Sequence, residues 1–296
     1  MIQKIALIGA GAIGAYFIDC LDEKKDIELN VIAEGKRKER LIQEGIYVND
    51  HHYDLNVKEA KECGCVDLIL VATKYSGIQE ARDLLPLLIK EDTLVLSLLN
   101  GVDSEEILAK KIGREHIVDS LMRISSQRVG QSIHYTLGPS YGLFYGSEDQ
   151  NKIDRLNEFF STTKIQYHPI ENIRVDMWTK YASNIANNLP QAILQIPGVL
   201  YTNEHGLFMV SHLWEEVRQV ALAKGIEIAK EPIIFNGLKA KYSTLQDIEA
   251  KRHTEVDMFL GVLILMAKEY SIPVPYSEYT YHLIKALELK NDGYFD

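Results

Sequence analysis

The chain has few cysteines, no long hydrophobic run and no excess of positive charge. Only Cys20, Cys63 and Cys65 occur among its 296 residues. Such an odd and sparse set argues against a disulfide framework and indicates a reducing compartment, so we expect a cytoplasmic protein. The first apolar run ends at Gly9, and no apolar stretch approaches the roughly 20 residues that span a bilayer. We therefore expect neither a signal peptide nor a membrane segment.

The charge balance excludes further classes of protein. Lys and Arg number 32 against 42 Asp and Glu, which gives a formal net charge of -10. A molecule with this balance repels polyanions, so we expect no nucleic-acid partner and no binding to an anionic membrane surface. An anionic small ligand would need a few cationic side chains placed close to it.

A metal site is not expected either. Cys63 and Cys65, with His51 and His52 upstream, match none of the common spacings of zinc ligands. Hydrophobic residues make up 46% of the chain and charged residues 25%, which is ordinary globular usage and gives enough core for two domains.

The first half of the chain alternates short apolar runs with helical periods. This alternation predicts a parallel sheet covered by helices on both faces. The predicted strands are Lys4–Ile8, Glu28–Ala33, Val66–Ala72 and Thr93–Leu98, and the predicted helices include Ala12–Leu21 and Gly77–Lys90. Further along, the pair Gly138-Pro139 separates two β-rich runs and predicts an antiparallel hairpin of Ser132–Leu137 with Tyr141–Tyr145.

From Glu171 onward the apolar spacing is almost purely helical. Apolar residues recur at intervals of three and four, which predicts the long helices Ile173–Leu194, Glu204–Lys224, Ser243–Tyr270 and Ser277–Leu289. The change of pattern predicts an α/β domain over 1–169 and an all-helical domain over 170–296.

The most informative motif is Gly9-Ala10-Gly11-Ala12-Ile13-Gly14, which follows the first predicted strand and opens the first predicted helix. Gly9 permits a tight turn, Gly11 lets the backbone approach a pyrophosphate, and Gly14 lets helix and strand pack closely. A glycine-rich structural turn is the alternative. The strand before the motif, the helix after it, and an acidic residue at Glu34 favour a dinucleotide site in a Rossmann domain.

Two opposed signals bear on the choice of nicotinamide cofactor. Glu34 can accept hydrogen bonds from the adenine ribose and would repel a 2′-phosphate, whereas Lys36 and Arg37 would attract one. Lys36, Arg37 and Lys38 are equally consistent with the solvated start of a helix.

A polar stripe stands out in the helical half. Lys180, Asn184 and Asn188 follow one another at intervals of four, so they share one helix face over about 12 Å. A merely solvated face would not favour Asn, which is a mediocre helix former. Further on, Ser243 with Gln246 fits a capping box, a role that does not exclude contact with a ligand.

These segments together resemble the ketopantoate reductase (2-dehydropantoate 2-reductase) family, over most of the chain. The resemblance rests on Gly9-Ala-Gly11-Ala-Ile-Gly14, Ala72-Thr73-Lys74, Leu99-Asn100-Gly101, Asn172-Ile-Arg174, Trp178-x-Lys180-x-x-x-Asn184, Ser243-x-Leu-Gln-Asp247, Arg252-His-Thr-Glu255-x-Asp257 and Ile272-x-Val-Pro275. It implies a Rossmann domain followed by a helical domain of the 6-phosphogluconate-dehydrogenase type. It also implies NADPH-dependent reduction of 2-dehydropantoate to (R)-pantoate in pantothenate and coenzyme A synthesis.

The resemblance also implies roles for individual residues. Lys180 matches the catalytic general acid and Glu255 the carboxylate that orients the substrate, a small 2-keto acid. Substrate contacts fall on Asn100, Asn184, Asn188 and Ser243, and Lys74 matches a contact on the cofactor side. Together with the residues already discussed, the predicted cofactor contacts are Gly9 to Gly14, Glu34, Lys36, Arg37, Lys74 and Asn100. Ser243 and Glu255 would lie about 18 Å apart on an unbroken helix, so contact of both with one substrate requires a bend between Asp247 and His253.

Other interpretations stay open at this point. Where the family usually carries Arg at the end of the second strand this chain has Glu34, which makes NADH a second candidate cofactor. Glu34 thereby favours the alternative of an NAD-dependent D-2-hydroxyacid dehydrogenase of the mandelate type. A non-catalytic nucleotide-sensing protein would give no reason for Lys180 and Glu255 to occur together, and the sequence leaves a homodimer open.

Overall fold

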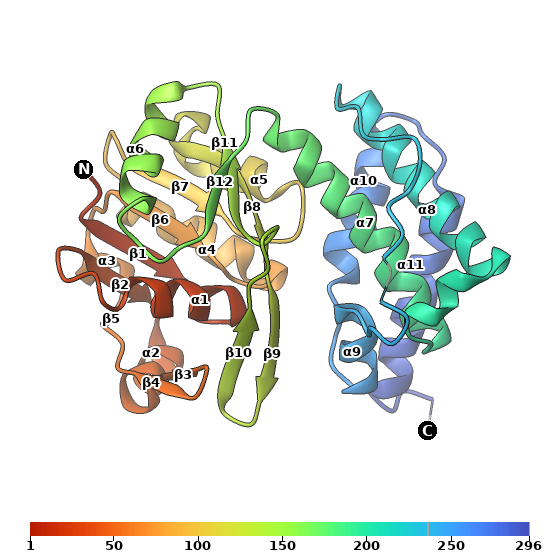
Figure 1. Cartoon of the computed structure of the whole chain (residues 1–296), viewed down its shortest axis with the longest axis horizontal. Coiled ribbons are helices and arrows are strands. Elements are labelled where there is room, and N and C mark those ends of the chain that lie inside the picture. Colours follow the sequence, from red (N-terminus) through yellow and green to blue (C-terminus); the bar gives the residue numbers. More distant parts are fainter. Residues whose placement is uncertain (236, 296) are drawn as a thin grey trace. The chain divides into compact units, whose positions relative to one another are not determined.

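The computed structural model describes residues 1–235 and 237–295 of the chain. It contains two compact units, Met1–Ile173 and Arg174–Asp296 (Figure 1). The first unit is a mixed α/β structure and the second is helical, so the predicted fold class is confirmed.

The main sheet of the first unit has eight strands in the order β12-β11-β8-β7-β6-β1-β2-β5. The six strands from β8 to β5 run parallel, whereas β11 is antiparallel to β8. The chain moves outward from β1 in one direction to β2 and in the other to β6, which creates the switch point where α/β sheets bind ligands. The strands are β1 (Lys4–Ile8), β2 (Glu28–Ile32), β5 (Val57–Lys58), β6 (Leu68–Val71), β7 (Leu94–Ser97), β8 (Ile117–Arg123), β11 (Gly142–Gly146) and β12 (Tyr167–Pro169).

Hydrophobic cores on the two faces of this sheet explain why its strands are continuously apolar. In β1, Ile5 and Leu7 belong to one core cluster, while Ala6 and Ile8 belong to the other. Alternate side chains of a strand point to opposite faces, so a strand covered on both sides has no polar face. The covering helices are α1 (Ala12–Leu21), α2 (Gly35–Glu44), α3 (Ala60–Cys63), α4 (Ile78–Leu84), α5 (Ser104–Ile112) and α6 (Gln150–Phe160).

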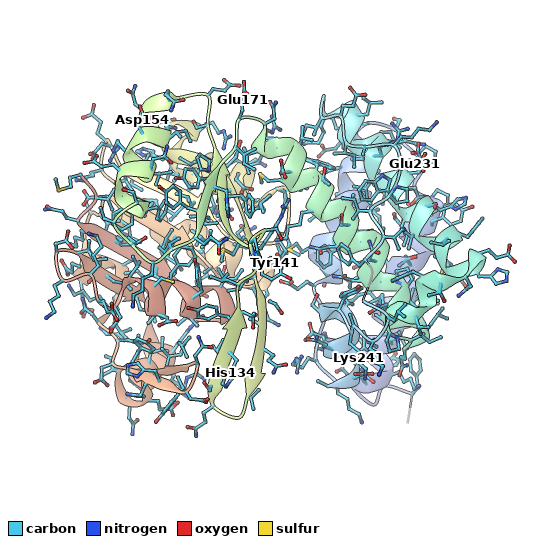
Figure 2. The ribbon with its side chains drawn as sticks, viewed as in Figure 1. His134, Tyr141, Asp154, Glu171, Glu231 and Lys241 are labelled. Carbon is cyan, nitrogen blue, oxygen red and sulfur yellow. The ribbon has the colours of Figure 1, made fainter. Side chains whose placement is uncertain are left out.

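A second sheet of four strands corrects the predicted hairpin. β10 (Ser132–Thr136) pairs with β9 (Ser125–Val129) and β3 (Ile46–Val48), and β4 (His51–Tyr53) completes this sheet. The run after Gly138-Pro139 instead forms β11 of the main sheet, so the predicted pairing of Ser132–Leu137 with Tyr141–Tyr145 is wrong. Figure 2 labels His134 on β10 and Tyr141 just before β11. The true hairpin turns at Gly130, and its first strand is too polar to be recognised as a strand.

Two tyrosine hydroxyls attach the small sheet to α1. Tyr53 of β4 donates to Asp19 Oδ1 at 2.5 Å, and Tyr135 of β10 donates to Asp19 Oδ2. Burial, together with the Asp19 carboxylate, raises the pKa of both tyrosines, so they remain neutral donors. Burial also raises the pKa of the neighbouring Cys20 thiol to about 11, which makes this cysteine an unreactive part of the core.

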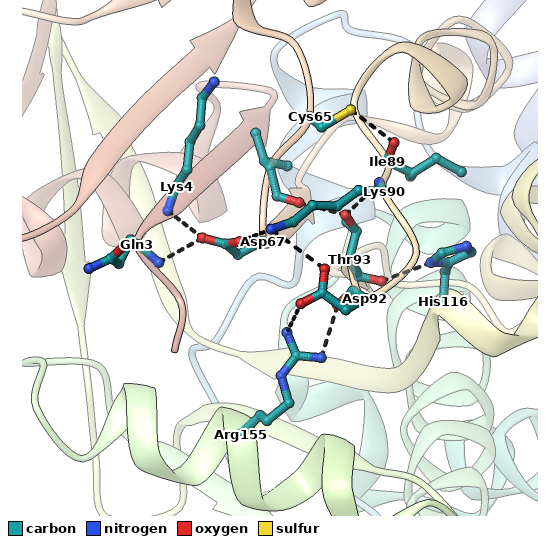
Figure 3. A network of polar contacts seen from close by, with 11 residues as sticks. Gln3, Lys4, Cys65, Asp67, Ile89, Lys90, Asp92, Thr93, His116 and Arg155 are labelled. Atoms are coloured by element: carbon teal, nitrogen blue, oxygen red, sulfur yellow. Dashed lines mark hydrogen bonds and ion pairs between the residues drawn. The ribbon is translucent and has the colours of Figure 1, made fainter.

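The amino-terminal edge of the main sheet is held by a polar network (Figure 3). Asp67, at the start of β6, accepts hydrogen bonds from the backbone N–H groups of Gln3 and Lys4 at 2.8 Å and pairs with Lys90 at 2.6 Å. Burial by itself would raise the pKa of Asp67, but Lys90 and the two N–H groups outweigh it and lower the pKa. This cluster lies at the strand starts, opposite the edge where α/β sheets bind ligands, and we assign it a structural role.

The second unit consists of helices and irregular connections. Its elements are α7 (Ile173–Leu194), the 3-10 helix η4 (Gly198–Thr202), α8 (Glu204–Ala223), α9 (Ser243–Glu249), the π-helical segment η5 (Asp257–Gly261), α10 (Val262–Glu269) and α11 (Pro275–Asn291). The predicted continuous helix Ser243–Tyr270 is wrong, because the chain leaves the helix after Glu249 and re-enters it at η5. Across the described residues, no helix combines the length and the apolar character needed to cross a membrane.

Candidate functional site

The three glycines of the turn between β1 and α1 are needed for different reasons. Gly9 has φ +110°, and a Cβ there would lie 2.6 Å from the carbonyl oxygen of Ala72. A Cβ on Gly14 would overlap the carbonyl oxygen of Gly9. Gly11 is exposed, and a Cβ there would meet nothing within 4 Å. Packing of the protein therefore requires Gly9 and Gly14, whereas Gly11 suits a ligand that approaches the backbone closely.

The amino-terminus of α1 can bind an anion. Gly11 is its N-cap and supplies no side-chain hydrogen bond. The first N–H groups of a helix lack intrahelical partners and carry partial positive charge, so they attract phosphate. The remaining predicted contact residues of the turn are half-buried beside it: Ala10, Ala12 and Ile13.

The end of β6 adds polar groups to the same turn. Thr73 packs against Gly9, and its buried Oγ1 has no hydrogen-bond partner among the described residues. A buried hydroxyl without a partner is unfavourable, and a ligand could supply the missing bond. Lys74 follows directly and is exposed. This set of groups fits a dinucleotide cofactor, which the sequence predicts for residues 9–14 and Lys74.

The acidic and basic residues that follow β2 lie at the N-terminus of α2. Glu34 is the exposed N-cap of α2, and Lys36 and Arg37 are exposed in its first turn. Cations are unfavourable at a helix N-terminus unless an anion lies nearby. Lys38 pairs with Glu62 at 2.6 Å and is thereby engaged within the protein. Lys36 and Arg37 thus remain the cations that could meet a 2′-phosphate, with Glu34 opposing them.

Asn100 lies in the segment between β7 and α5, and a chain of buried polar groups connects these two elements. Ser97, at the end of β7, donates to Ser104 Oγ at 2.7 Å, and Ser104 donates to Glu105 Oε2 at 2.8 Å. Glu105 is only 4% exposed. Burial, followed by the charge of Asp119, raises the pKa of Glu105 to about 8, so this carboxyl group is protonated at neutral pH.

This buried carboxyl group predicts a pH-dependent stability. The unfolded chain ionises Glu105 near the ordinary pKa of a glutamate, 4.5, while the folded chain holds the proton up to about pH 8. The contribution of Glu105 to the free energy of unfolding should therefore be complete below the lower value, fall as pH rises between the two, and be lost above the higher value. Because each pKa unit corresponds to about 1.4 kcal/mol, the total is a few kcal/mol.

Glu105→Gln should remove this dependence, because the amide has no charged form. Denaturant unfolding across the same pH range should give a variant that is clearly more stable than the parent chain at the alkaline end. The exposed neighbour Glu106 supplies the matched control, since Glu106→Gln makes the same change of side chain at the surface of the helix and leaves the buried carboxyl group in place. An unchanged slope in Glu105→Gln would contradict the assignment.

In the second unit, the predicted polar stripe runs along α7 from a half-buried to a buried position. Lys180 and Asn184 are half-buried, and Asn188 is only 4% exposed. Asn188 Nδ2 lies 3.4 Å from Ser243 Oγ, so these two predicted substrate contacts are brought together. The buried Oδ1 of Asn188 has no hydrogen-bond partner among the described residues, and a hydroxyl on a ligand would satisfy it.

Two further carboxamides on α7 hold the irregular segment that leads to Ser243. This segment runs between α8 and α9, and Figure 2 labels Glu231 and Lys241 on it. Asn187 Nδ2 donates to the carbonyl oxygen of Ile233 at 2.9 Å, and Gln191 Oε1 accepts from the backbone N–H of Tyr242 at 3.1 Å. The same helix that carries the stripe therefore fixes the backbone in front of Ser243.

The predicted capping role of Ser243 is wrong. Tyr242 is the N-cap of α9, Ser243 is the first helical residue, and no side chain caps this end. Gln246 Nε2 instead donates to the carbonyl oxygen of Lys241 at 2.7 Å. The hydroxyl of Ser243 is exposed, and its contact in the protein is with Asn188.

The structure supplies the bend that the predicted site needs between Asp247 and His253. Lys251 has φ +52°, and the backbone N–H of Arg252 donates to the carbonyl oxygen of Asp247 at 2.8 Å. The Arg252 side chain also bonds to the Asp247 carboxylate at 2.8 Å. The bend thus uses a left-handed lysine and an ionic hydrogen bond in place of glycine or proline. Glu255, which is half-buried, does not lie on the same helix as Ser243.

A π-helical segment connects Glu255 to α7. Glu255 accepts a hydrogen bond from the backbone N–H of Phe259 at 3.0 Å through its own carbonyl oxygen and lies just before η5. The Tyr181 hydroxyl contacts the backbone carbonyl oxygens of Met258 and Phe259. π-helical turns leave the regular bonding pattern and are frequent at functional sites. Tyr181 is the neighbour of Lys180, so it links the helix of the predicted general acid to the segment behind the predicted carboxylate.

Sequence reasoning missed the residues that support these side chains. Tyr181, Asn187 and Gln191 are all fully buried polar or aromatic residues on α7. Asn187 and Gln191 are four residues apart, so they lie on one face of the helix. Two carboxamides at this spacing are a sequence signal for a second polar face on α7. Within the described part of the chain, no cluster of three or more His, Cys, Asp or Glu side chains is suited to a metal ion.

Comparison with known protein families finds a match for each unit. The family model described as ketopantoate reductase PanE/ApbA matches residues 5–147, and the model of its C-terminal part matches residues 172–288. An uncharacterized oxidoreductase of Bacillus subtilis, YkpB, is 27% identical over 302 residues, covering 97% of this chain and 99% of the relative. A 2-dehydropantoate 2-reductase of Nostoc is 26% identical over 310 residues, covering 98% of this chain and 96% of the relative.

Solved structures of related enzymes have the same fold. A complex of D-mandelate dehydrogenase with NADH has a TM-score of 0.82 and 25% identity, and covers 98% of this chain and 99% of that one. A PanE/ApbA family ketopantoate reductase of Ralstonia eutropha has a TM-score of 0.80 and 22% identity, and covers 98% of this chain and all of that one. With both units matched, the chain belongs to the ketopantoate reductase PanE/ApbA family and is an NAD(P)-dependent oxidoreductase.

Proposed function

We propose that the protein reduces 2-dehydropantoate to (R)-pantoate, with NADPH as the reductant. The observation that carries this proposal is the stripe of Lys180, Asn184 and Asn188, which ends at Ser243 with an unsatisfied buried acceptor on Asn188. A small keto acid with a hydroxyl group needs a cationic proton donor at one end and hydrogen-bonding groups for its hydroxyl and carboxylate. Relatives that share 26% identity are named 2-dehydropantoate 2-reductase.

Lys180 is the general acid in this proposal. When bound, the reduced nicotinamide supplies a hydride to the keto carbon. Negative charge then develops on the keto oxygen, where the Lys180 ammonium stabilises it and donates the proton that completes the alcohol. Its place on a long helix beside the buried Tyr181 fixes the backbone from which it reaches the substrate.

The remaining stripe residues bind and orient the substrate. The unsatisfied Oδ1 of Asn188 accepts a hydrogen bond from a substrate hydroxyl, and Ser243 lies within reach of the same group. The half-buried Asn184 has no hydrogen-bond partner among the described residues, so both ends of its carboxamide are available. Glu255 accepts from a substrate hydroxyl and sets its orientation, and Asn100 contributes from the first unit. Residues 1–169 thus bind the cofactor and 170–296 supply most of the catalytic groups.

A second candidate is an NAD-dependent D-2-hydroxyacid dehydrogenase of the mandelate type. Glu34 favours it, because an exposed carboxylate at the N-cap of α2 attracts ribose hydroxyls and repels a 2′-phosphate. The likeness to D-mandelate dehydrogenase in complex with NADH is consistent with this candidate. Lys36 and Arg37 favour NADPH, and we propose that they outweigh the single carboxylate.

A panel of 2-keto acids, assayed with both cofactors, tests the proposed function. We expect NADPH oxidation with 2-dehydropantoate to have the highest kcat/KM of all combinations, and NADPH to bind more tightly than NADH. Tighter binding of NADH with preferential turnover of an aryl keto acid would establish the second candidate. Absence of any turnover, despite cofactor binding, would support a nucleotide-sensing protein instead.

A further inference from the structure

Glu288 is a buried carboxylate on α11. Residues next to Glu255 in the sequence contact it. It is 3% exposed. Its Oε1 accepts from the backbone N–H of Thr254 at 2.8 Å and from the Thr254 hydroxyl at 2.7 Å. The same hydroxyl oxygen accepts from the backbone N–H of Val256 at 3.2 Å. One carboxylate oxygen therefore holds the residue before Glu255 directly and the residue after it through Thr254.

The other oxygen of Glu288 forms an ion pair with Lys285 and lies near the His253 ring. Lys285 Nζ lies 2.7 Å from Oε2, and His253 Nδ1 lies 3.6 Å from it. Burial by itself would raise the pKa of Glu288, but the bonds from Lys285 and Thr254 outweigh it and lower the pKa. The carboxylate is ionised, and its bonds to Thr254 are charge-assisted, which makes them stronger than neutral hydrogen bonds.

Neighbouring side chains on the same face of α11 extend this support beyond Glu255. Tyr281 donates to Asp257 Oδ1 at 2.7 Å, and Lys285 Nζ lies 3.3 Å from Asp257 Oδ2. Tyr281, Lys285 and Glu288 follow at intervals of four and three, which places them on one helix face. This face thus contacts residues 253, 254 and 257, on both sides of Glu255, while Tyr181 holds η5 from α7.

Building on the role proposed above for Glu255, we propose that Glu288 is a positioning residue that orients Glu255 for substrate through Thr254. Both oxygens of Glu288 are engaged by the protein, so it acts through the backbone of residues 254–256. A buried charge is costly, and a merely structural contact could be made by neutral groups. The charge is explained if the loop after the bend must be held in one conformation.

A double-mutant cycle measures whether Glu288 acts through Glu255. Glu288→Gln and Thr254→Val should each lower kcat/KM for 2-dehydropantoate by about tenfold to a hundredfold, the usual effect of losing a hydrogen bond to a charged group. Thr254→Ser, which keeps the hydroxyl, should retain most of the activity. In a chain that already carries Glu255→Ala, Glu288→Gln should have almost no further effect, and the cofactor Kd should be unchanged in every variant.

Glu216 supplies the matched control. It is a buried carboxylate of the same unit that accepts from the backbone N–H groups of Tyr276 and Ser277 at the far end of α11. Glu216→Gln should lower the melting temperature, while its effect on kcat/KM should be the same with and without Glu255. Additive losses for Glu288→Gln and Glu255→Ala, or equal activity of Thr254→Val and the parent, would overturn the proposal.

Amide hydrogen exchange separates this proposal from the proposed function. The N–H groups of Thr254 and Val256 should exchange markedly faster in Glu288→Gln, while those of η5 keep their protection. If the parent turns over a different keto acid, the cycle is measured with that acid and decides the proposal equally well. If the parent turns over none, the proposed function fails, and unchanged exchange in Glu288→Gln would separately overturn the anchoring role.

Discussion

Lys180→Ala should lower kcat for the keto acid by about a hundredfold to ten-thousandfold, the range typical for removal of a general acid. No other cation lies on the predicted polar stripe of α7, because Asn184 and Asn188 are neutral. The fold should be retained, since Lys180 is half-buried and the helix is anchored by its buried neighbours. Steady-state kinetics with NADPH and 2-dehydropantoate, together with circular dichroism, measure both parts.

Lys180→Arg separates the two contributions of the side chain. A guanidinium keeps the positive charge but does not give up its proton at ordinary pH. We therefore expect Arg to restore part of the substrate affinity and little of kcat. Equal activity of Lys180→Ala and the parent protein would remove Lys180 from the mechanism, and full activity of Lys180→Arg would leave it only an electrostatic role.

Gly11→Ala and Gly14→Ala should fail in different ways, although both alter the same turn. Alanine at Gly11 points into open space, so the protein should fold normally and lose about tenfold to a hundredfold in cofactor affinity, or about 1.4 to 2.8 kcal/mol. Alanine at Gly14 overlaps the carbonyl oxygen of Gly9, which is backbone and cannot turn aside. That variant should be strongly destabilised, by roughly the 1–3 kcal/mol of an overpacked core or more.

Cofactor titration by fluorescence and thermal unfolding distinguish the two outcomes. For Gly11→Ala we expect an unchanged melting temperature without cofactor and a smaller increase when NADPH is added. A normal cofactor Kd in Gly11→Ala would mean that the backbone of the turn does not approach the pyrophosphate. A stable Gly14→Ala protein would contradict the close packing of α1 on β1.

The sequence predicted best those elements whose boundaries are encoded locally. The bounds of β1 and α1 match the predicted Lys4–Ile8 and Ala12–Leu21, because Gly9 and Gly11 separate them. β9 was missed because its sequence, Ser-Ser-Gln-Arg-Val, has too little apolar character to indicate a strand. β9 pairs with β10 through a turn at Gly130. In the sequence, Gly138-Pro139 is a stronger turn signal than the single Gly130, and the hairpin was therefore expected there.

The bend before Glu255 could not be predicted, for a related physical reason. No glycine or proline occurs between Ile248 and Val256, so no residue in this polar stretch marks the position of the break. The left-handed Lys251 and the bonds of Arg252 to Asp247 turn the chain after α9, and the distant Glu288 then holds Thr254 beyond the turn. The stripe of Lys180, Asn184 and Asn188 was visible because its members lie on one helix. Tyr181 and Glu288 instead acquire their roles from partners elsewhere in the chain, Tyr181 from η5 and Glu288 from Thr254 in the segment before it.

The small sheet has a consequence for the order of folding. Its strands come from two distant stretches, 46–53 and 125–136, and β5 to β8 of the main sheet lie between them in the sequence. When β3 pairs with β10, the chain between them closes into a long loop that contains much of the first unit. In an unfolded chain such a long loop closes slowly, because its closure costs more entropy than that of a short loop. We expect the parallel strands to assemble first and bring the two stretches together. The hydroxyl contacts of Tyr53 and Tyr135 with Asp19 would then be among the last to form.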